Sequence, residues 1–177
     1  LFIARKALEQ LDSIDALTEE QTLRLAGLYV EAAQDATEGL PRADGPENNI
    51  CDILSKSFDI DPEAVPGLTR VLGAMLIRLE RHDPQYIDVF ETLVEEEPQQ
   101  PVWAIELATI LHAQEFYERV LEVLRPVLDY NPELDSSLSE DTQSADTSSP
   151  VSLRSRIHRL LAAAHAACYS MALAHEL

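Results

Sequence analysis

Residues 101–133 read PVWAIELATILHAQEFYERVLEVLRPVLDYNPE, and this stretch decides the fold. Apolar residues first gather near one side of a helical pattern that includes Leu107 and Leu111. After a tight turn, a second stripe recurs at i, i+3, i+4 and i+7 spacing from Tyr117 to Leu128. The dipeptide Asn131-Pro132 then ends the pattern. The stretch therefore predicts two short helices joined by a turn.

One residue of this stretch disagrees with the helical pattern. Pro126 lies inside the second predicted helix and has no N–H to donate to the carbonyl of Glu122. A proline in a helix interior costs about 3 kcal/mol or kinks the helix. We expect a bend at this point.

Proline-containing dipeptides divide the chain at nearly constant intervals. They are Asp61-Pro62, Glu97-Pro98 and Asn131-Pro132, which lie 36 and 34 residues apart. A period of about 34 residues is typical of stacked helix-turn-helix repeats, in which each helix pair buries its apolar face against the next. The composition agrees, because Ala and Leu are abundant and aromatic residues make up only 6%. We therefore expect an all-α protein.

The stretch resembles the tetratricopeptide repeat. That family has an aromatic residue early in its first helix, Leu followed by a small residue, an aromatic at the start of its second helix, and a closing proline. Trp103, Leu107, Ala108, Tyr117 and Pro132 supply this pattern, with Trp103 one place early. The resemblance is most specific for residues 67–133. The pair of Leu and a small residue recurs elsewhere at Leu25-Ala26, Leu72-Gly73 and Leu161-Ala162.

The resemblance implies a right-handed α-solenoid of antiparallel helix pairs, with about seven or eight helices. We expect a single domain over residues 1–177, interrupted by a loop at 37–49 and an acidic Ser/Thr-rich disordered loop at 134–150. The chain starts with Leu1 and not Met, so we expect it to be a fragment of a longer or processed chain.

Charge and cysteine content narrow the function classes. The formal net charge is −19, which disfavours direct binding to nucleic acid. Cys51 and Cys168 make no disulfide framework, so a reducing compartment is expected, either the cytoplasm or the nucleus. The longest uncharged apolar tract, residues 160–173, is shorter than the roughly 20 residues that span a bilayer. We expect no membrane span.

Catalytic signatures do not occur in the sequence. The five glycines are scattered, so no phosphate-binding loop forms, and no Ser, Cys or His set matches a known nucleophile motif. His165 and Cys168 lie one helical turn apart without an established zinc spacing. We therefore predict that the chain is not an enzyme, and we expect no cofactor and no metal site.

The basic residues give the candidate site, because only 13 of them occur. In tetratricopeptide-like proteins the first helices line a concave groove, where arginine can pair with the carboxylates of a bound peptide or helix. The alternative for each arginine is a helix end or a neighbouring acid as its partner. The groove candidates are Arg70, Arg78, Thr109, His112, Arg156 and Arg159.

The predicted function is a scaffold or adaptor subunit that binds other proteins, as part of a multiprotein complex. Two alternatives remain open. An acidic escort would neutralise a basic client, such as a histone or ribosomal protein, mainly through charge. A helical regulatory domain of a larger enzyme would agree with the missing Met. The salt dependence of binding distinguishes the scaffold from the escort. Escort binding weakens steeply as ionic strength rises, while apolar groove binding persists.

Overall fold

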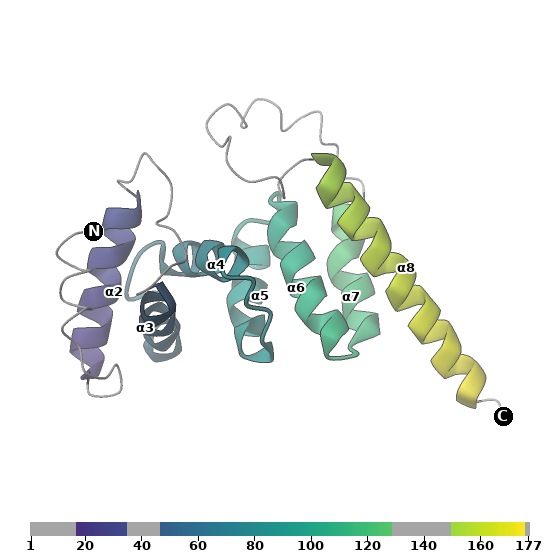
Figure 1. Cartoon of the computed structure of the whole chain (residues 1–177), viewed down its shortest axis with the longest axis horizontal. Helices are drawn as coiled ribbons and strands as arrows, with labels where there is room; N and C mark the ends of the chain where they lie inside the picture. The colour runs from purple at the N-terminus through teal and green to yellow at the C-terminus, as the bar shows by residue number, and fades with distance from the viewer. Residues whose placement is uncertain (1–16, 35–46, 129–149, 176–177) are drawn as a thin grey trace. The chain divides into compact units, whose positions relative to one another are not determined.

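A computed structural model describes residues 17–34, 47–128 and 150–175 (Figure 1). These residues contain seven α-helices and two 3₁₀ turns, and no strand. The predicted all-α fold is confirmed. The chain divides into two compact units, Leu1–Arg81 and His82–Leu177, which we call unit 1 and unit 2 and describe separately. Within the described residues no helix is long and apolar enough to cross a membrane.

Unit 1 contains the helices α2 (Glu19–Gln34), α3 (Glu47–Ile60) and α4 (Leu68–Arg78). The helix α2 packs against both α3 and α4, and α3 packs against α4. A reciprocal pair of bonds fixes the start of α2. The Gln21 amide donates to Thr18 Oγ1 at 3.3 Å, and the Thr18 amide donates to Gln21 Oε1 at 3.0 Å. This capping box satisfies two backbone groups that the first turn leaves without partners.

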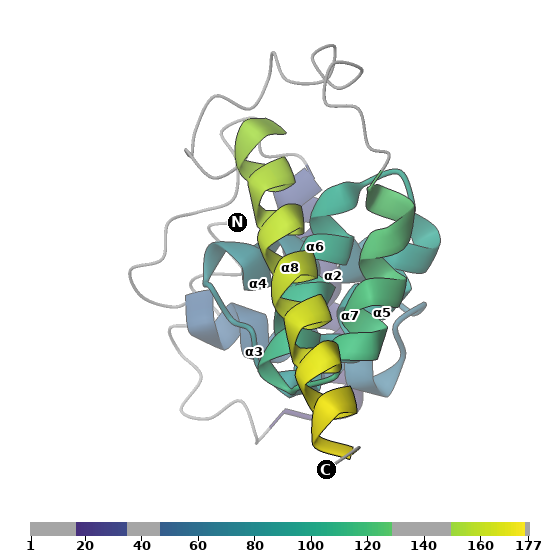
Figure 2. The ribbon, with the colours of Figure 1, turned by 90° about the vertical axis from the view of Figure 1, so that its right-hand side faces the viewer.

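The described residues of unit 2 form four α-helices. They and its two 3₁₀ turns are η2 (Pro84–Tyr86), α5 (Ile87–Glu96), α6 (Pro101–Ala113), α7 (Tyr117–Leu124), η3 (Arg125–Val127) and α8 (Pro150–His175). Each helix packs on the next one in the chain, and α8 packs on α6 as well. Figure 2 shows α8 lying across α6 and α7.

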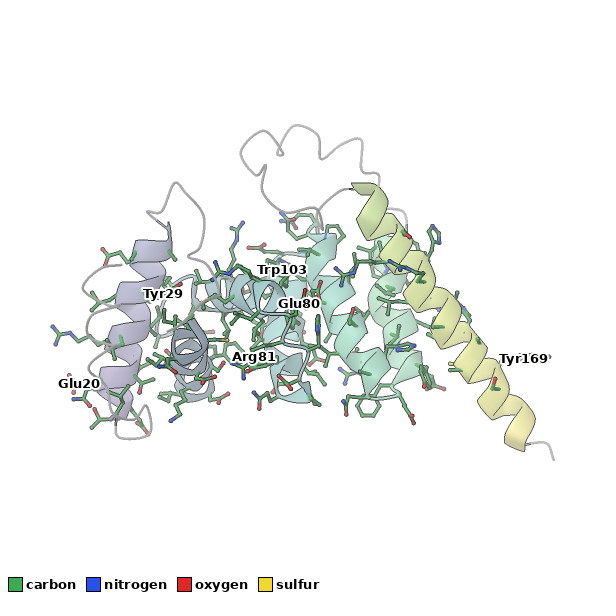
Figure 3. The ribbon with its side chains drawn as sticks, in the orientation of Figure 1. Glu20, Tyr29, Glu80, Arg81, Trp103 and Tyr169 are labelled. Atoms are coloured by element: carbon green, nitrogen blue, oxygen red, sulfur yellow. The ribbon has the colours of Figure 1, made fainter. Side chains whose placement is uncertain are left out.

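The helix α6 forms the core of unit 2. Its residues are apolar almost all round, because α6 packs against α5, α7 and α8. Trp103, which Figure 3 labels, is buried. Its ring centroid lies 6.5 Å from that of Phe90 on α5. Its Nε1 atom donates to Glu97 Oε2 at 3.0 Å, which satisfies the polar end of a large apolar side chain.

The first helices show the same pattern of burial when they are aligned on the pair of Leu and a small residue. The small residue is fully buried in α2 and α6, as Ala26 and Ala108, and Gly73 in α4 is buried too. The next position is half-exposed in these helices: Gly27, Ala74 and Thr109. Aligned positions of these helices therefore have the same degree of burial, which supports the predicted helical repeat within each unit.

The first helices α4 and α6 also end in the same way. Glu80 and Glu115 each follow the helix with positive φ angles of 52° and 63° (Figure 3 labels Glu80). The Arg81 amide then donates to the Leu76 carbonyl at 2.9 Å, and the Phe116 amide donates to the Leu111 carbonyl at 3.0 Å. These are Schellman caps in which glutamate takes the usual place of glycine. The caps lie 35 residues apart, which matches the predicted period.

The second helix of the quoted stretch is shorter than predicted. The helix α7 ends at Leu124, and the 3₁₀ turn Arg125–Val127 replaces the expected bend within a longer α-helix. The cause is Pro126, which cannot donate to Glu122 and therefore ends the i to i−4 bonding. Val127 is nevertheless buried, so the turn still contributes to the core.

Two predicted loop boundaries need correction. The helix α3 begins at Glu47, so residues 47–49 of the expected loop 37–49 are helical. The helix α8 begins at Pro150, which belonged to the expected loop 134–150; proline suits a first helical position because its missing N–H would have no partner there. The remainder of both loops lies outside the described residues. A single domain over residues 1–177 stays a prediction.

Candidate functional site

A buried carboxylate lies at the centre of unit 2. Glu106 is on α6, and its side chain is 2% exposed. Its Oε1 atom accepts a bond from Arg156 Nη2 at 2.8 Å, and its Oε2 atom lies 3.0 Å from His82 Nε2. A charged group out of contact with water is stable only when such partners replace its hydration. We call Glu106, Arg156 and His82 the Glu106 cluster.

The Glu106 cluster joins three parts of unit 2 that are far apart in the sequence. Arg156 is near the start of α8, and His82 precedes η2, 24 residues before Glu106. On α8, Ile157 and Leu161 are buried one helical turn apart, next to Arg156. Apolar packing and the ion pair therefore act together to fix the position of α8 on α6.

The three members of the cluster differ in their exposure to solvent. The side chains of His82 and Arg156 are 36% and 26% exposed, whereas the carboxylate below them is almost fully buried. Hydrogen-bond donors therefore stand at the surface of a chain whose net charge is −19. A guanidinium group carries five N–H donors, so the bond to Glu106 does not use up its capacity to bind a second carboxylate.

Three further predicted site residues lie in unit 2. Thr109 is half-buried, and its hydroxyl donates to a carbonyl four residues earlier in α6 at 2.7 Å. His112 is half-buried, with its ring edge-on to Tyr117 at a centroid distance of 5.5 Å. Arg159 is exposed, and its Nε atom donates to the Ser155 carbonyl at 3.3 Å. Since α6 and α8 pack together, these residues share two neighbouring first helices.

The other two predicted site residues lie in unit 1. Arg70 is exposed and Arg78 is half-buried, and both are on α4. Partner binding by the six predicted residues stays a prediction. For Arg156 the structure supports the alternative reading, because this residue pairs with a neighbouring acid.

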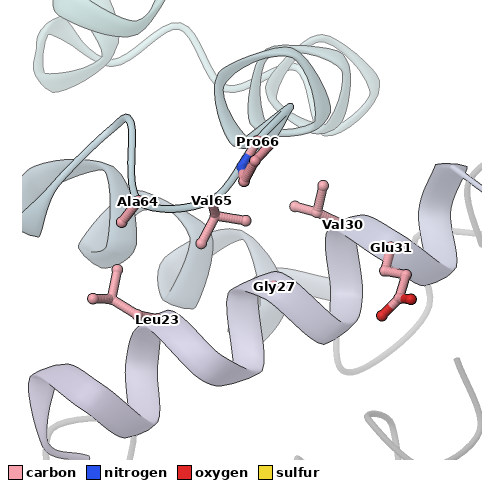
Figure 4. A pocket seen from close by; sticks show the side chains of 7 residues that line it. All are labelled: Leu23, Gly27, Val30, Glu31, Ala64, Val65 and Pro66. Carbon is pink, nitrogen blue, oxygen red and sulfur yellow. The ribbon is translucent and has the colours of Figure 1, made fainter.

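Unit 1 contains an open groove beside α2 (Figure 4). Its volume is about 370 Å³, and it lies between α2 and the connection that leads into α4. Every lining residue except one is apolar. They are Leu23, Gly27, Val30, Glu31, Ala64, Val65 and Pro66. Gly27 occupies the register position of Thr109, so the groove lies on the face of the first helices that the sequence predicted for partner binding.

Cys51 on α3 is a free, buried thiol in unit 1. Burial raises the pKa of the Cys51 thiol above the ordinary 9.0, and the nearby Arg81 guanidinium partly opposes this change. Arg81 also donates to Asp52 Oδ1 at 2.9 Å. The thiol is therefore protonated at neutral pH and a weak nucleophile. Among the described side chains, no group of three or more His, Cys, Asp or Glu residues could hold a metal ion.

Sequence reasoning did not identify Glu106 or His82 as site residues. The available signal was Glu106 itself, the one acidic residue in the helix Pro101–Ala113, whose other residues are apolar except Thr109 and His112. A single acid in such a largely apolar helix predicts a buried carboxylate and hence a cationic partner. The identity of that partner depended on the fold, because His82 and Arg156 come from distant positions.

Comparisons with known proteins add little to this picture. No protein-family model matches the chain. No curated protein matches it either. One solved structure, "MamA MSR-1 C2", is similar at a TM-score of 0.43 and 14% sequence identity, over 96% of this chain and 90% of that one. The fold assignment therefore rests on the helices and the repeated burial pattern described above.

Proposed function

We propose that the chain is a protein-interaction scaffold, which binds a peptide or helix of a partner on the exposed face of its first helices. The observation that supports this proposal most directly is the groove beside α2. It is open, apolar and wide enough for side chains, and Gly27, which lines it, has the same register position as Thr109, one of the predicted groove residues. Exposed concave apolar surface is the usual means by which a helical repeat binds a segment of another protein.

Gly27 gives the groove its depth. A Cβ atom added at this position would meet no other atom within 4 Å. A partner side chain can therefore approach the backbone of α2 closely. Glu31 is the one charged residue of the lining and is exposed, so a basic residue of the partner next to its apolar anchor would be favoured.

In unit 2 the same face carries donors for carboxylates. The Glu106 cluster fixes α8 on α6, and Arg159 lies exposed less than one turn beyond Arg156. We propose that Arg159, with His112 and Thr109, contacts acidic residues of a bound segment. The two units would then select different chemical features, an aliphatic anchor in unit 1 and carboxylates in unit 2.

The groove is tested by filling it. Gly27→Trp places a large side chain in open space, and Glu20→Trp adds the same side chain at an exposed position of α2 outside the groove lining. Both variants and the unchanged chain are used for affinity capture from the source lysate, with quantitative mass spectrometry. We expect Gly27→Trp to lose a partner that Glu20→Trp retains. Equal recovery by all three would contradict binding in the groove.

The face of unit 2 is tested by charge reversal in the same assay. Arg159→Glu should weaken capture of that partner, whereas Arg125→Glu, at an exposed residue of η3, should not. Capture at low and high salt then tests the escort alternative. Recovery of basic proteins that disappears at high salt, with no effect of Gly27→Trp, would favour an acidic escort over a groove-binding scaffold.

A further inference from the structure

The groove beside α2 follows one side of that helix for two turns. Three of its lining residues, Leu23, Gly27 and Val30, recur at i, i+4 and i+7 spacing. At 1.5 Å per residue, the distance from Leu23 to Val30 along the helix axis is about 10 Å. Figure 4 shows Ala64 across from Leu23 at one end of this line and Pro66 near Val30 at the other. The groove therefore has two distinct ends.

An acidic residue lies next to each end of the groove. Glu31 belongs to the lining and directly follows Val30, while Glu63 directly precedes Ala64 in the connection to α4. Both acids are exposed, and among the described residues neither carboxylate has a hydrogen-bond or ion-pair partner. The carboxylate of Asp61 differs, because its Oδ1 atom accepts a bond from the Glu63 amide at 3.0 Å. Glu31 and Glu63 are therefore the acids that a partner can pair with.

The two segments that form the groove, residues 19–34 and 61–67, contain five acidic residues and one basic residue. The acids are Glu19, Glu20, Glu31, Asp61 and Glu63. The basic residue is Arg24, which does not belong to the lining. Charge of this sign attracts a cationic segment and repels nucleic acid and anionic lipid.

The length of the groove matches a helix better than an extended segment. In a helix, residues i and i+7 lie about 10 Å apart on the same side, with i+3 and i+4 between them. In an extended segment about 10 Å corresponds to three residues, and side chains three apart point to opposite faces. The groove volume of about 370 Å³ is too small for a helix, which is about 10 Å across. Only side chains from one face of such a helix can enter it.

We propose that the groove beside α2 binds an amphipathic helix of a partner protein. Apolar residues at i+3 and i+4 of that helix enter the groove, and basic residues at i and i+7 pair with Glu31 and Glu63. The site is formed in advance, since the Ala64 amide donates to the Asp61 carbonyl at 3.2 Å and the Leu68 amide to the Val65 carbonyl at 3.0 Å. The inference rests on the proposed scaffold function and specifies the ligand of its site in unit 1.

Synthetic helical peptides test the inference by fluorescence anisotropy with the full chain at low ionic strength. The first is a labelled, alanine-based helix of about 20 residues with Leu at i+3 and i+4 and Lys at i and i+7. One control moves both lysines to the opposite side of the helix, and another replaces them with Gln. We expect both controls to bind at least about fivefold more weakly. Equal binding of all three peptides, or no binding of the first up to about 1 mM, would overturn the inference.

Substitutions in the chain identify the two carboxylates. Glu31→Gln and Glu63→Gln should each weaken binding of the first peptide by about two- to fivefold and leave binding of the Gln peptide unchanged. Glu118→Gln is the matched control, because it removes the same charge from an exposed position of α7 in unit 2, and it should have no effect. Equal losses in all three variants would show an effect of net charge alone and would contradict pairing at the groove.

Gly27→Trp separates failure of this inference from failure of the scaffold proposal. If it removes the captured partner while the three peptides bind equally or not at all, the groove binds a partner but its ligand is not a basic amphipathic helix. If it changes neither capture nor peptide binding, both the scaffold proposal and this inference are wrong. Loss of both the captured partner and the first peptide is the result that we expect.

Discussion

Arg156 on α8 and Glu106 on α6 are joined by a bond of 2.8 Å between Nη2 and Oε1, and the arginine stands on the solvent side of the pair. This arrangement makes the two residues unequal. Removing the acid leaves a cation that can turn to water, whereas removing the arginine leaves a buried carboxylate with His82 as its remaining partner. The second change is therefore the more harmful one.

We predict that Arg156→Leu lowers the free energy of unfolding by about 2–3 kcal/mol, because a buried charge loses its strongest partner. Urea denaturation followed by circular dichroism measures the change. Arg119→Leu is the matched control, since Arg119 pairs with Glu91 in a more exposed setting and should cost less than about 1 kcal/mol. Losses of similar size in both variants would show that Glu106 does not depend on Arg156.

The buried thiol gives a prediction at alkaline pH. Because burial raises the pKa of Cys51 in the folded state, the unfolded chain loses this proton first as the pH rises above about 9. The contribution is constant below that pH, and stability then falls up to the folded-state pKa. The difference in unfolding free energy between Cys51→Ala and the unchanged chain should therefore shift in favour of the variant between pH 8 and pH 10. A difference that is independent of pH would contradict the raised pKa.

The two Schellman caps predict a stabilising substitution. Glu115 has a φ angle of 63°, a conformation that glycine adopts without the steric cost of a side chain. Glu115→Gly should raise the free energy of unfolding by about 0.5–1 kcal/mol. Glu122→Gly, in the interior of α7, should instead lower it by about 1 kcal/mol. Thermal melts of the two variants decide the matter, and a loss of stability in both would contradict the cap.

At Gly27, in the interior of α2, we expect alanine to be more stable than glycine, the opposite of the preference at Glu115. Glycine is unfavourable there, and a methyl group at this position meets no neighbour within 4 Å. Gly27→Ala should therefore raise the free energy of unfolding by about 0.5–1 kcal/mol in urea. Gly73→Ala should gain less, because Gly73 is buried in α4 and a close-packed interior tolerates added volume poorly. A larger gain for Gly73→Ala would contradict the assignment of Gly27 to open space.

The helices were predictable because their signals are local. The quoted stretch fixed both helices of its pair, since the apolar stripes, the tight turn and Pro132 all lie within about 30 residues. The sequence predicts a kink at Pro126 within a helix that continues for another turn. In the structure Pro126 ends the α-helix instead, so α7 stops at Leu124. Proline allows both outcomes, and the local sequence does not choose between them.

The candidate site was less predictable, since its geometry depends on long-range contacts. The six predicted residues include Arg156, but the sequence did not show that Arg156 would meet Glu106 across two helices. The groove beside α2 was missed because it needs the connection around Val65 as well as Gly27. Spacing along one helix predicts which residues share a face, and it does not predict what packs against that face.

The exposed Ala162 of α8 has a consequence for engineering. In α2 and α6 the equivalent alanine admits the close approach of a following helix, and in α8 the same geometry is present and open to solvent. The exposed surface of α8 around Ala162 is therefore a site on which a designed helical hairpin could be stacked. The molecule can serve as a modular building block whose length is set by the number of hairpins added to it.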